Sequence, residues 1–174
     1  MREIIKDKVI VNDDWEVLRL AEGETPEGVS VPAGKTIVPL TVWQAQRDAL
    51  QGRAEIGVWI ASDERPEELK GEVEKFAVIA VDFPKFSDGR GYSIAYNLRT
   101  RLGYEGELRA IGDVLRDQMF YMQRVGFNAF ATRPDRNIHD ALKALTDFSE
   151  AYQISVDRKS PLFRRVDRQA VAPK

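Results

Sequence analysis

Hydrophobic positions along the chain change their spacing at residue 37. Before that point, two short apolar runs, Val9–Val11 and Trp15–Leu18, flank a turn-rich trio of Asn and Asp residues. Alternating runs joined by such a turn predict a β-hairpin within residues 1–20. Residues 21–35 combine glycines and prolines with acidic side chains, which indicates an exposed loop.

From residue 37 to residue 152, apolar runs of strand length alternate with segments of helical periodicity. The expected strands are 37–40, 56–60, 76–81, 108–111 and 127–131, and the expected helical segments are 41–50, 66–75, 92–102, 113–125 and 138–152. Strands separated by helices imply right-handed crossovers and parallel pairing. We therefore expect an α/β fold: a mostly parallel sheet with flanking helices, as an open sheet or a partial barrel, plus the N-terminal hairpin.

Local signals mark the ends of three of these helices. Thr41 with Gln44 fits a capping box, and Gly126 is well placed to stop the fourth helix. Asn137 is the expected cap of the last helix, whose apolar stripe continues at helical spacing to Tyr152.

The length and composition bound the class of protein. A chain of 174 residues favours one domain, which we place at residues 1–156, followed by a polar, basic tail at 157–174. With 43% hydrophobic and 31% charged residues the chain is typical of a globular protein. No segment has the length of a membrane span, and the first residues lack the apolar core of a signal peptide, so the expected location is cytoplasmic, with no membrane partner.

Charge is unevenly distributed along the chain. Residues 1–84 carry 10 Lys and Arg against 17 Asp and Glu, a net charge of −7, whereas 85–136 carry 9 against 6 (+3) and 137–174 carry 7 against 5 (+2). An acidic chain with no continuous basic run argues against a nucleic-acid partner. The positive excess in the middle third favours a small anion or an acidic protein surface, or else a solvated face.

The most distinctive segment is the glycine-rich stretch that follows the apolar run 78–81. Arg90 stands between Gly89 and Gly91, which allow positive φ angles and close backbone approach. A guanidinium at the start of a helix suits bidentate recognition of phosphate, sulfate or carboxylate. We expect residues 82–93 to bind an anion and to form the rim of the principal pocket.

Further polar residues follow the other predicted strands. Asp82 and Asp113 are candidate general acids or bases, or else loop and helix caps. If Arg109 points inward it needs an acidic partner, for which Asp82 or Asp113 is plausible. The candidate anion-binding residues are Lys85, Gly89, Arg90, Gly91, Arg109 and Arg133.

The residue types in the chain limit which cofactors and metal sites it can hold. The chain has no cysteine, which excludes disulfides and thiolate-held zinc or iron–sulfur clusters. His139 is the only histidine, which argues against a histidine-based triad or a multi-histidine metal site. Two alternatives stay open: Mg²⁺ on Asp82, Asp88 and Asp113, and a flavin stacked on Phe86, Tyr92 and Tyr96.

Several separated sequence blocks together resemble a known bacterial family. The blocks are Asp82-Phe-Pro, Phe86-Ser-Asp-Gly-Arg-Gly-Tyr-Ser93, Leu98-Arg99, Gly106-Glu-Leu-Arg-Ala-Ile-Gly-Asp-Val-Leu115, Asp117-Gln118 and Gly126-Phe-Asn-Ala-Phe130. The family has no established function, and its genes commonly lie beside those of assimilatory sulfite reductase. Its members are sometimes labelled probable oxidoreductases of sulfite reduction. The resemblance runs from about Ile37 to Tyr152, and Asn128 departs from it where many relatives have an acidic residue.

The resemblance implies an accessory protein or oxidoreductase component of assimilatory sulfite reduction, with sulfite reductase as partner. Such a helper would act by docking, by delivering electrons or by assisting assembly. Because the chain lacks cysteine, electron transfer would need a bound flavin or a partner. The alternative is an enzyme that acts on a phosphorylated or sulfated small molecule, with Arg90 on the anion and Asp82 or Asp113 moving protons.

Overall fold

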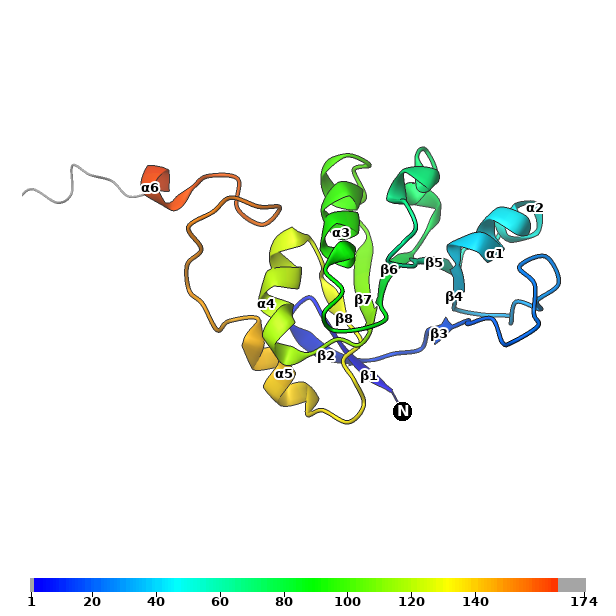
Figure 1. The fold of residues 1–174 in the computed structure, drawn as a ribbon, viewed down its shortest axis with the longest axis horizontal. Coiled ribbons are helices and arrows are strands. Elements are labelled where there is room, and N and C mark those ends of the chain that lie inside the picture. The colour runs from blue at the N-terminus through cyan, green and yellow to red at the C-terminus, as the bar shows by residue number, and fades with distance from the viewer. Residues whose placement is uncertain (1, 166–174) are drawn as a thin grey trace, which may run out of the picture.

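A computed structural model describes residues 2–165 and shows an eight-stranded sheet flanked by helices (Figure 1). The strand order is β2-β1-β8-β7-β6-β5-β4-β3. The strands are β1 (Glu3–Lys6), β2 (Val9–Asn12), β3 (Glu16–Val17), β4 (Thr36–Pro39), β5 (Ile56–Ile60), β6 (Val78–Phe83), β7 (Glu107–Gly112) and β8 (Ala129–Phe130). Pairing is parallel from β3 to β8 and antiparallel where β1 joins β8 and β2. The predicted fold class is confirmed.

Short and medium helices connect the parallel strands. They are α1 (Leu40–Ala45), α2 (Arg47–Leu50), the 3₁₀ turns η1 (Pro66–Leu69) and η2 (Val73–Lys75), α3 (Arg90–Thr100), α4 (Arg116–Val125), α5 (Ile138–Ala144) and α6 (Leu162–Arg165). Among the helices of residues 2–165, none is both long and apolar enough to cross a lipid bilayer.

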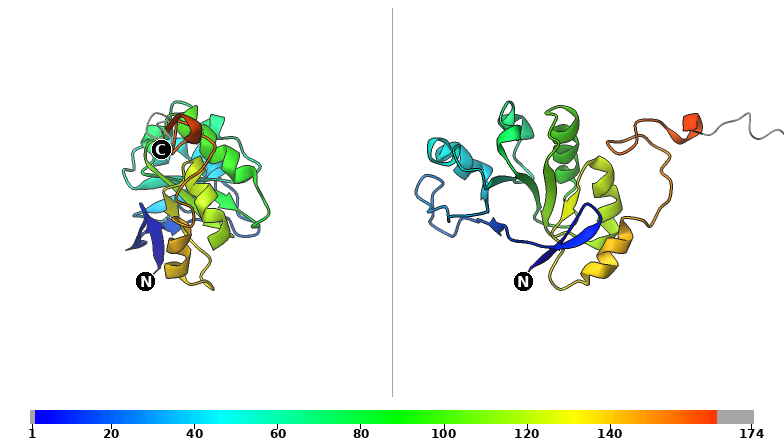
Figure 2. Two further views of the ribbon diagram at one scale, coloured as in Figure 1. Left: turned by 90° about the vertical axis from the view of Figure 1, so that its left-hand side faces the viewer. Right: turned by 180° about the vertical axis from the view of Figure 1, so that it is seen from behind.

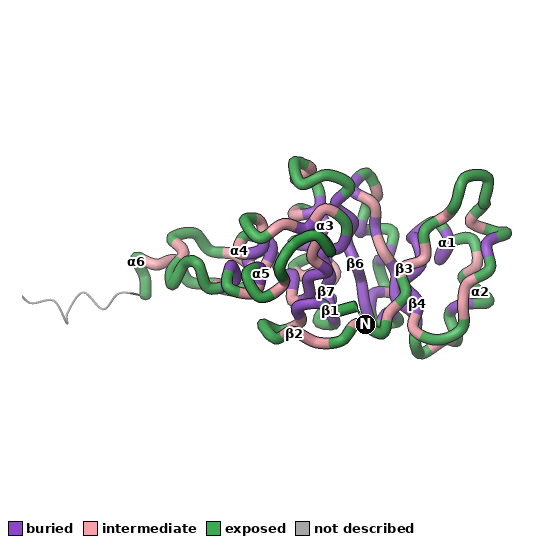
Figure 3. Tube along the Cα trace, turned by 90° about the horizontal axis from the view of Figure 1, so that it is seen from below, coloured by how far each residue is buried: buried purple, intermediate pink, exposed green. Residues whose placement is uncertain are grey.

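Two hydrophobic clusters lie on opposite faces of the sheet. The larger one joins the helices to the sheet and includes Trp43, Leu98 and Met122. The smaller one has no helical residue; its buried members are Ile4, Ile37, Val78, Ala80, Ile111 and Ala131. Burial on both faces explains why β6 reads as an apolar run. In Figure 3 the trace of β6 has the colour of buried residues.

The sheet is curled into a half-barrel, and chain connectivity requires this curvature. Strands β2 and β3 form opposite edges of the sheet, yet only residues 13–15 separate them in sequence. Eight strands laid flat would place the two edges roughly 34 Å apart, whereas the step from Asn12 to Glu16 spans at most about 14 Å. Residues 13–15, which we call the crossing segment, therefore run across the concave face (Figure 2).

The N-terminal hairpin is present but is built from different strands than predicted. Strands β1 and β2 are joined by Asp7 and Lys8, whose φ angles are +48° and +66°. These angles suit a tight turn of the type that normally contains Asn or Gly. Neither residue stands at these two positions, so no sequence signal marks this turn. Trp15–Leu18 is not the second hairpin arm, because its residues Glu16 and Val17 pair in parallel with β4.

The last helix is shorter than predicted. Helix α5 ends at Ala144, so Phe148 and Tyr152 lie beyond it. The Thr146 hydroxyl donates a hydrogen bond of 3.0 Å to the Lys143 carbonyl oxygen. Short polar side chains of this kind compete with the backbone hydrogen bonds of a helix. Phe148 instead packs edge-on against Phe120.

Two of the three predicted helix signals are confirmed. The Asn137 side chain accepts hydrogen bonds from the backbone N–H groups of His139 and Asp140 in the first turn of α5, and Gly126 ends α4 with a φ of +118°. The capping box at Thr41 is wrong, because α1 begins at Leu40 without a side-chain cap. The helix then breaks at Gln46, whose amide donates to the carbonyl oxygens of residues 26 and 29. Of the predicted tail 157–174, residues 166–174 lie outside the described residues.

Candidate functional site

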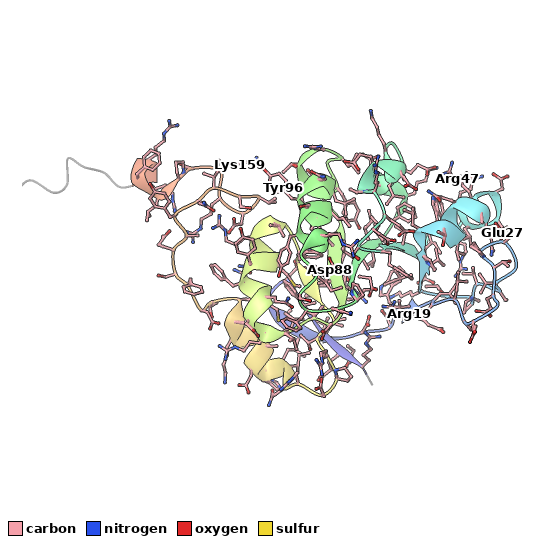
Figure 4. The ribbon with its side chains drawn as sticks, viewed as in Figure 1. Arg19, Glu27, Arg47, Asp88, Tyr96 and Lys159 are labelled. Carbon is pink, nitrogen blue, oxygen red and sulfur yellow. The ribbon has the colours of Figure 1, made fainter. Side chains whose placement is uncertain are left out.

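The carboxyl ends of the central parallel strands meet along one edge of the sheet, which we call the carboxyl edge. It carries Ser62 after β5, Asp82 near the end of β6, Asp113 after β7 and Arg133 after β8. In folds with parallel strands, binding sites gather at this edge. Figure 4 shows Arg19 and Asp88 toward this end, and Tyr96 and Lys159 toward the other.

Asp82 lies at the centre of this edge and is almost buried, with 8% of its surface exposed. Its Oδ1 atom accepts from Arg19 Nη2 at 2.6 Å, and the Arg19 guanidinium carbon lies 5.0 Å from the centre of the Trp59 ring. A side chain at Gly112, where φ is +89°, would place its Cβ 2.7 Å from Asp82 Oδ1. Glycine at position 112 therefore leaves room for the Asp82 carboxylate.

Asp113 organises the loop at residues 84–88, which we call the Phe86 loop. Asp113 Oδ2 accepts from the Phe86 backbone N–H at 2.8 Å, while Gln118 Nε2 donates to the Phe86 carbonyl oxygen. Asp113 Oδ1 accepts from Arg133 Nη1 at 3.1 Å. Asp113 is therefore not the cap of α4, whose N-cap residue is Leu115.

Arg90 is the first residue of α3 and forms a bidentate pair with Asp88. Its Nε and Nη2 atoms lie 3.0 and 2.7 Å from the two Asp88 oxygens. Neither flanking glycine adopts a positive φ; Gly91 is required because a Cβ there would lie 2.6 Å from the Phe83 ring. The Arg90 side chain, and after it Ser62, hold the pKa of the Asp88 carboxyl well below its usual range.

We expect Arg90→Ala to raise the pKa of Asp88 toward its ordinary value of about 3.9. A native pKa below the unfolded one means that Asp88 stabilises the fold above the unfolded pKa, and that this contribution is lost as pH falls through the native pKa. Titration of the Asp88 carboxyl carbon by NMR measures the change. Lys85→Ala, which alters an exposed lysine of the same loop, is the control, and an equal pKa in Arg90→Ala and the parent would contradict the pairing.

Arg109 points inward and has acidic partners, but these are not Asp82 or Asp113. Its guanidinium lies 2.9 Å from Asp13 Oδ1 and 2.6 Å from Glu107 Oε1, and Lys6 Nζ lies 2.7 Å from Glu107 Oε2. The Asp13 and Arg109 side chains are 1% and 2% exposed. Arg109 therefore ties the crossing segment to β7 on the concave face and is not available at the Phe86 loop.

The structure brings together only some of the predicted site residues. Lys85, Gly89, Arg90 and Gly91 share one loop and helix start, and Arg133 reaches this loop through Asp113. Arg133 also pairs with Asp135 at 2.8 Å. At the carboxyl edge, Arg90 and Arg133 are thus already engaged by carboxylates.

The Phe86 loop does not line a pocket of the kind we predicted. The five pockets that we describe among residues 2–165 are all lined outside residues 82–93, so the expectation that the loop forms the rim of the principal pocket is wrong. Within the same described range no three carboxylate or histidine side chains are placed to hold one metal ion, so Asp82, Asp88 and Asp113 do not form a Mg²⁺ site.

The three predicted stacking aromatics have separate surroundings. Tyr92 packs edge-on against Phe83 and Tyr121, with ring centres 5.6 and 5.7 Å away. Tyr96 instead lines a groove with Ile154 and Lys159. Phe86 projects from its own loop and is 58% exposed.

Arg19 is the site residue that sequence reasoning missed. It lies 63 positions before Asp82, and only the parallel pairing of β3 with β4 carries it to the carboxyl edge. A buried aspartate at a strand end signals the need for a cationic partner, but sequence alone does not say which cation is near.

The protein is an α/β half-barrel whose carboxyl edge carries arginine–carboxylate pairs and the projecting Phe86 loop. The sequence model of a family described as "Bacterial protein of unknown function (DUF934)" matches residues 57–163, more than half of the 174-residue chain. The chain belongs to this family. Comparison with curated proteins found no match, and neither did comparison with solved structures.

Proposed function

We propose that this protein is an accessory component of assimilatory sulfite reduction that docks onto sulfite reductase through the Phe86 loop. The pathway rests on the resemblance of the sequence blocks at residues 82–130 to proteins whose genes lie beside those of the reductase. The family to which residues 57–163 belong is described as one of unknown function, so the pathway rests on the resemblance alone. The docking role rests on the geometry of the carboxyl edge.

The single observation that carries the docking role is the clamped backbone of Phe86. Its N–H donates to Asp113 and its carbonyl oxygen accepts from Gln118, so both polar backbone groups are held by the protein. The ring nevertheless stands 58% exposed. An aromatic ring on a fixed backbone binds a partner at low entropic cost, because little freedom remains to be lost.

The charge pattern favours docking over the small-anion enzyme. A phosphate or sulfate at Arg90 would have to displace the bidentate Asp88 carboxylate, and one at Arg133 would have to compete with Asp113 and Asp135. A flat protein surface needs no such displacement, since rim ion pairs can stay solvated. The absence of cysteine also fits a helper that leaves iron–sulfur chemistry to its partner.

Co-purification tests this proposal with tagged protein and sulfite reductase expressed in the same cells. We expect the wild-type protein to retain the reductase, and Phe86→Ala to weaken the complex by about 30-fold or more, the effect of a hot-spot aromatic. Phe163→Ala, which truncates an exposed ring outside the carboxyl edge, is the matched control.

Failure of the wild-type protein to bind the reductase under any condition that keeps both folded would contradict the partner. Equal retention by Phe86→Ala and the wild type would instead contradict the assignment of docking to this loop.

A further inference from the structure

A pocket lies at the end of the sheet opposite the carboxyl edge. What we infer from it does not depend on the proposed function. Its volume of 470 Å³ is in the range of small-molecule sites. It is an open pocket bordered by the β1–β2 turn, the end of α4, β8 and the segment after α5. The lining residues are Asp7, Lys8, Gln123, Phe127, Asn128, Phe130, Leu145, Asp157 and Arg158.

The segment after α5 closes one side of this pocket and is fastened to α4 by Arg124. The Arg124 guanidinium donates to the Gln153 carbonyl oxygen at 2.5 Å and to Asp157 Oδ1 at 3.1 Å. The Val156 N–H donates to the Arg124 carbonyl oxygen at 3.2 Å. Figure 1 shows this segment, in orange, passing alongside α4. The pocket wall is therefore held by specific contacts, although the segment has little regular structure.

Lys8 stands in the opposite wall in an unfavourable backbone conformation. Its φ of +66° is in the left-handed region, which glycine adopts freely and a lysine adopts at a cost. The turn is held in place because the Asp7 N–H donates 2.8 Å to the Asn128 carbonyl oxygen and Asn128 Nδ2 donates 3.1 Å to Asp7 Oδ1. The positive φ belongs to the tight hairpin turn described above, and these hydrogen bonds fix the position of Lys8 in the pocket wall.

Lys8 is the cation of the pocket without a carboxylate partner among the described residues. Asp157 pairs with Arg124 and Arg158 with Glu150, whereas the Asp7 carboxylate accepts a hydrogen bond from the neutral Asn128 amide. Lys8 is exposed, and within residues 2–165 no ion pair or hydrogen bond engages its ammonium group. The floor opposite it is apolar, made by Phe127, Phe130 and Leu145.

We propose that this pocket binds a small molecule with an apolar ring and one anionic group, a carboxylate, sulfonate or phosphate. The ring lies on Phe127, Phe130 and Leu145, and the anion pairs with Lys8. Gln123, half-buried at the rim, offers a neutral amide to a further polar atom of the ligand. The site uses none of the carboxyl-edge residues, so it is a second binding site on the same chain.

Two fluorescent probes of similar shape test the pocket in the purified protein. 8-Anilino-1-naphthalenesulfonate carries an anion, whereas N-phenyl-1-naphthylamine is neutral. We expect saturable binding of the anionic probe at one site per chain. Lys8→Gly should lower its affinity about tenfold, the value of one lost charge-assisted contact, and leave the neutral probe bound. The melting temperature of Lys8→Gly should not fall, since glycine relieves the positive φ.

Gln123→Trp supplies the second readout, because an indole at the rim fills the pocket and should abolish binding of both probes. Lys85→Ala, an exposed lysine at the other end of the sheet, should change neither affinity. Absence of saturable binding in the wild type, or equal affinity of Lys8→Gly for the anionic probe, overturns the proposal. So does an unchanged signal in a folded Gln123→Trp variant.

Discussion

Arg109→Ala is expected to lower the free energy of unfolding by about 3–5 kcal/mol, the typical cost of removing one partner from a buried ion pair. The substitution leaves the carboxylates of Asp13 and Glu107, which are 1% and 5% exposed, without the guanidinium that lies between them. One oxygen of Asp13, Oδ2, is already buried without a hydrogen bond among the described residues. Loss of the arginine therefore loosens the crossing segment from the concave face. It leaves Asp13 with only the longer pair to Arg2, at 3.8 Å, while Glu107 keeps its pair with Lys6.

Two neighbouring aspartates give this prediction a matched control. Asp13→Ala removes the other half of the buried pair and should also be strongly destabilising, whereas Asp14→Ala removes only the exposed pair with Lys35 and should have little effect. Urea unfolding followed by tryptophan fluorescence measures all three variants, because Trp15 lies on the crossing segment. Equal stabilities of Asp13→Ala and Asp14→Ala would contradict the crossing-segment anchor.

The parallel α/β fold could be predicted because its signals are local. Helix α3 shows an apolar stripe at helical spacing, Asn137 caps α5 with its own side chain, and Gly126 ends α4 in a left-handed conformation. Each of these features depends on residues within a few positions of one another, which is the distance over which sequence patterns carry information.

The curl of the sheet and the pairing of its charges could not be predicted, because they depend on distant residues. Arg109 meets Asp13 across 96 positions, and Arg19 meets Asp82 across 63. The need for an acid near a buried arginine is a sequence inference, but the choice of that acid follows from the crossing segment. Gly91 shows the same limit, since it is needed for the Phe83 ring and not for its own φ angle.

Deletion of the gene is expected to impair growth on sulfate or sulfite, while growth on cysteine or sulfide stays normal. A helper of the reductase matters only for steps that precede sulfide, so any reduced sulfur source bypasses it. The effect on growth should be large, because the deletion limits the whole supply of reduced sulfur.

Complementation links this phenotype to the Phe86 loop. The wild-type gene and Glu68→Ala, which changes an exposed residue of η1, should restore growth on sulfate, and Phe86→Ala should not. Equal amounts of each protein in the cell, checked by immunoblot, exclude loss of folding as the cause.

Growth rate on sulfate as sole sulfur source, compared between the deletion strain and its parent, tests the central claim most directly. We predict slow or absent growth of the deletion strain on sulfate and sulfite, together with parental growth on cysteine. Parental growth on sulfate, in a strain without a second copy of the gene and with normal sulfite reductase activity in extracts, would contradict the assignment to sulfite reduction.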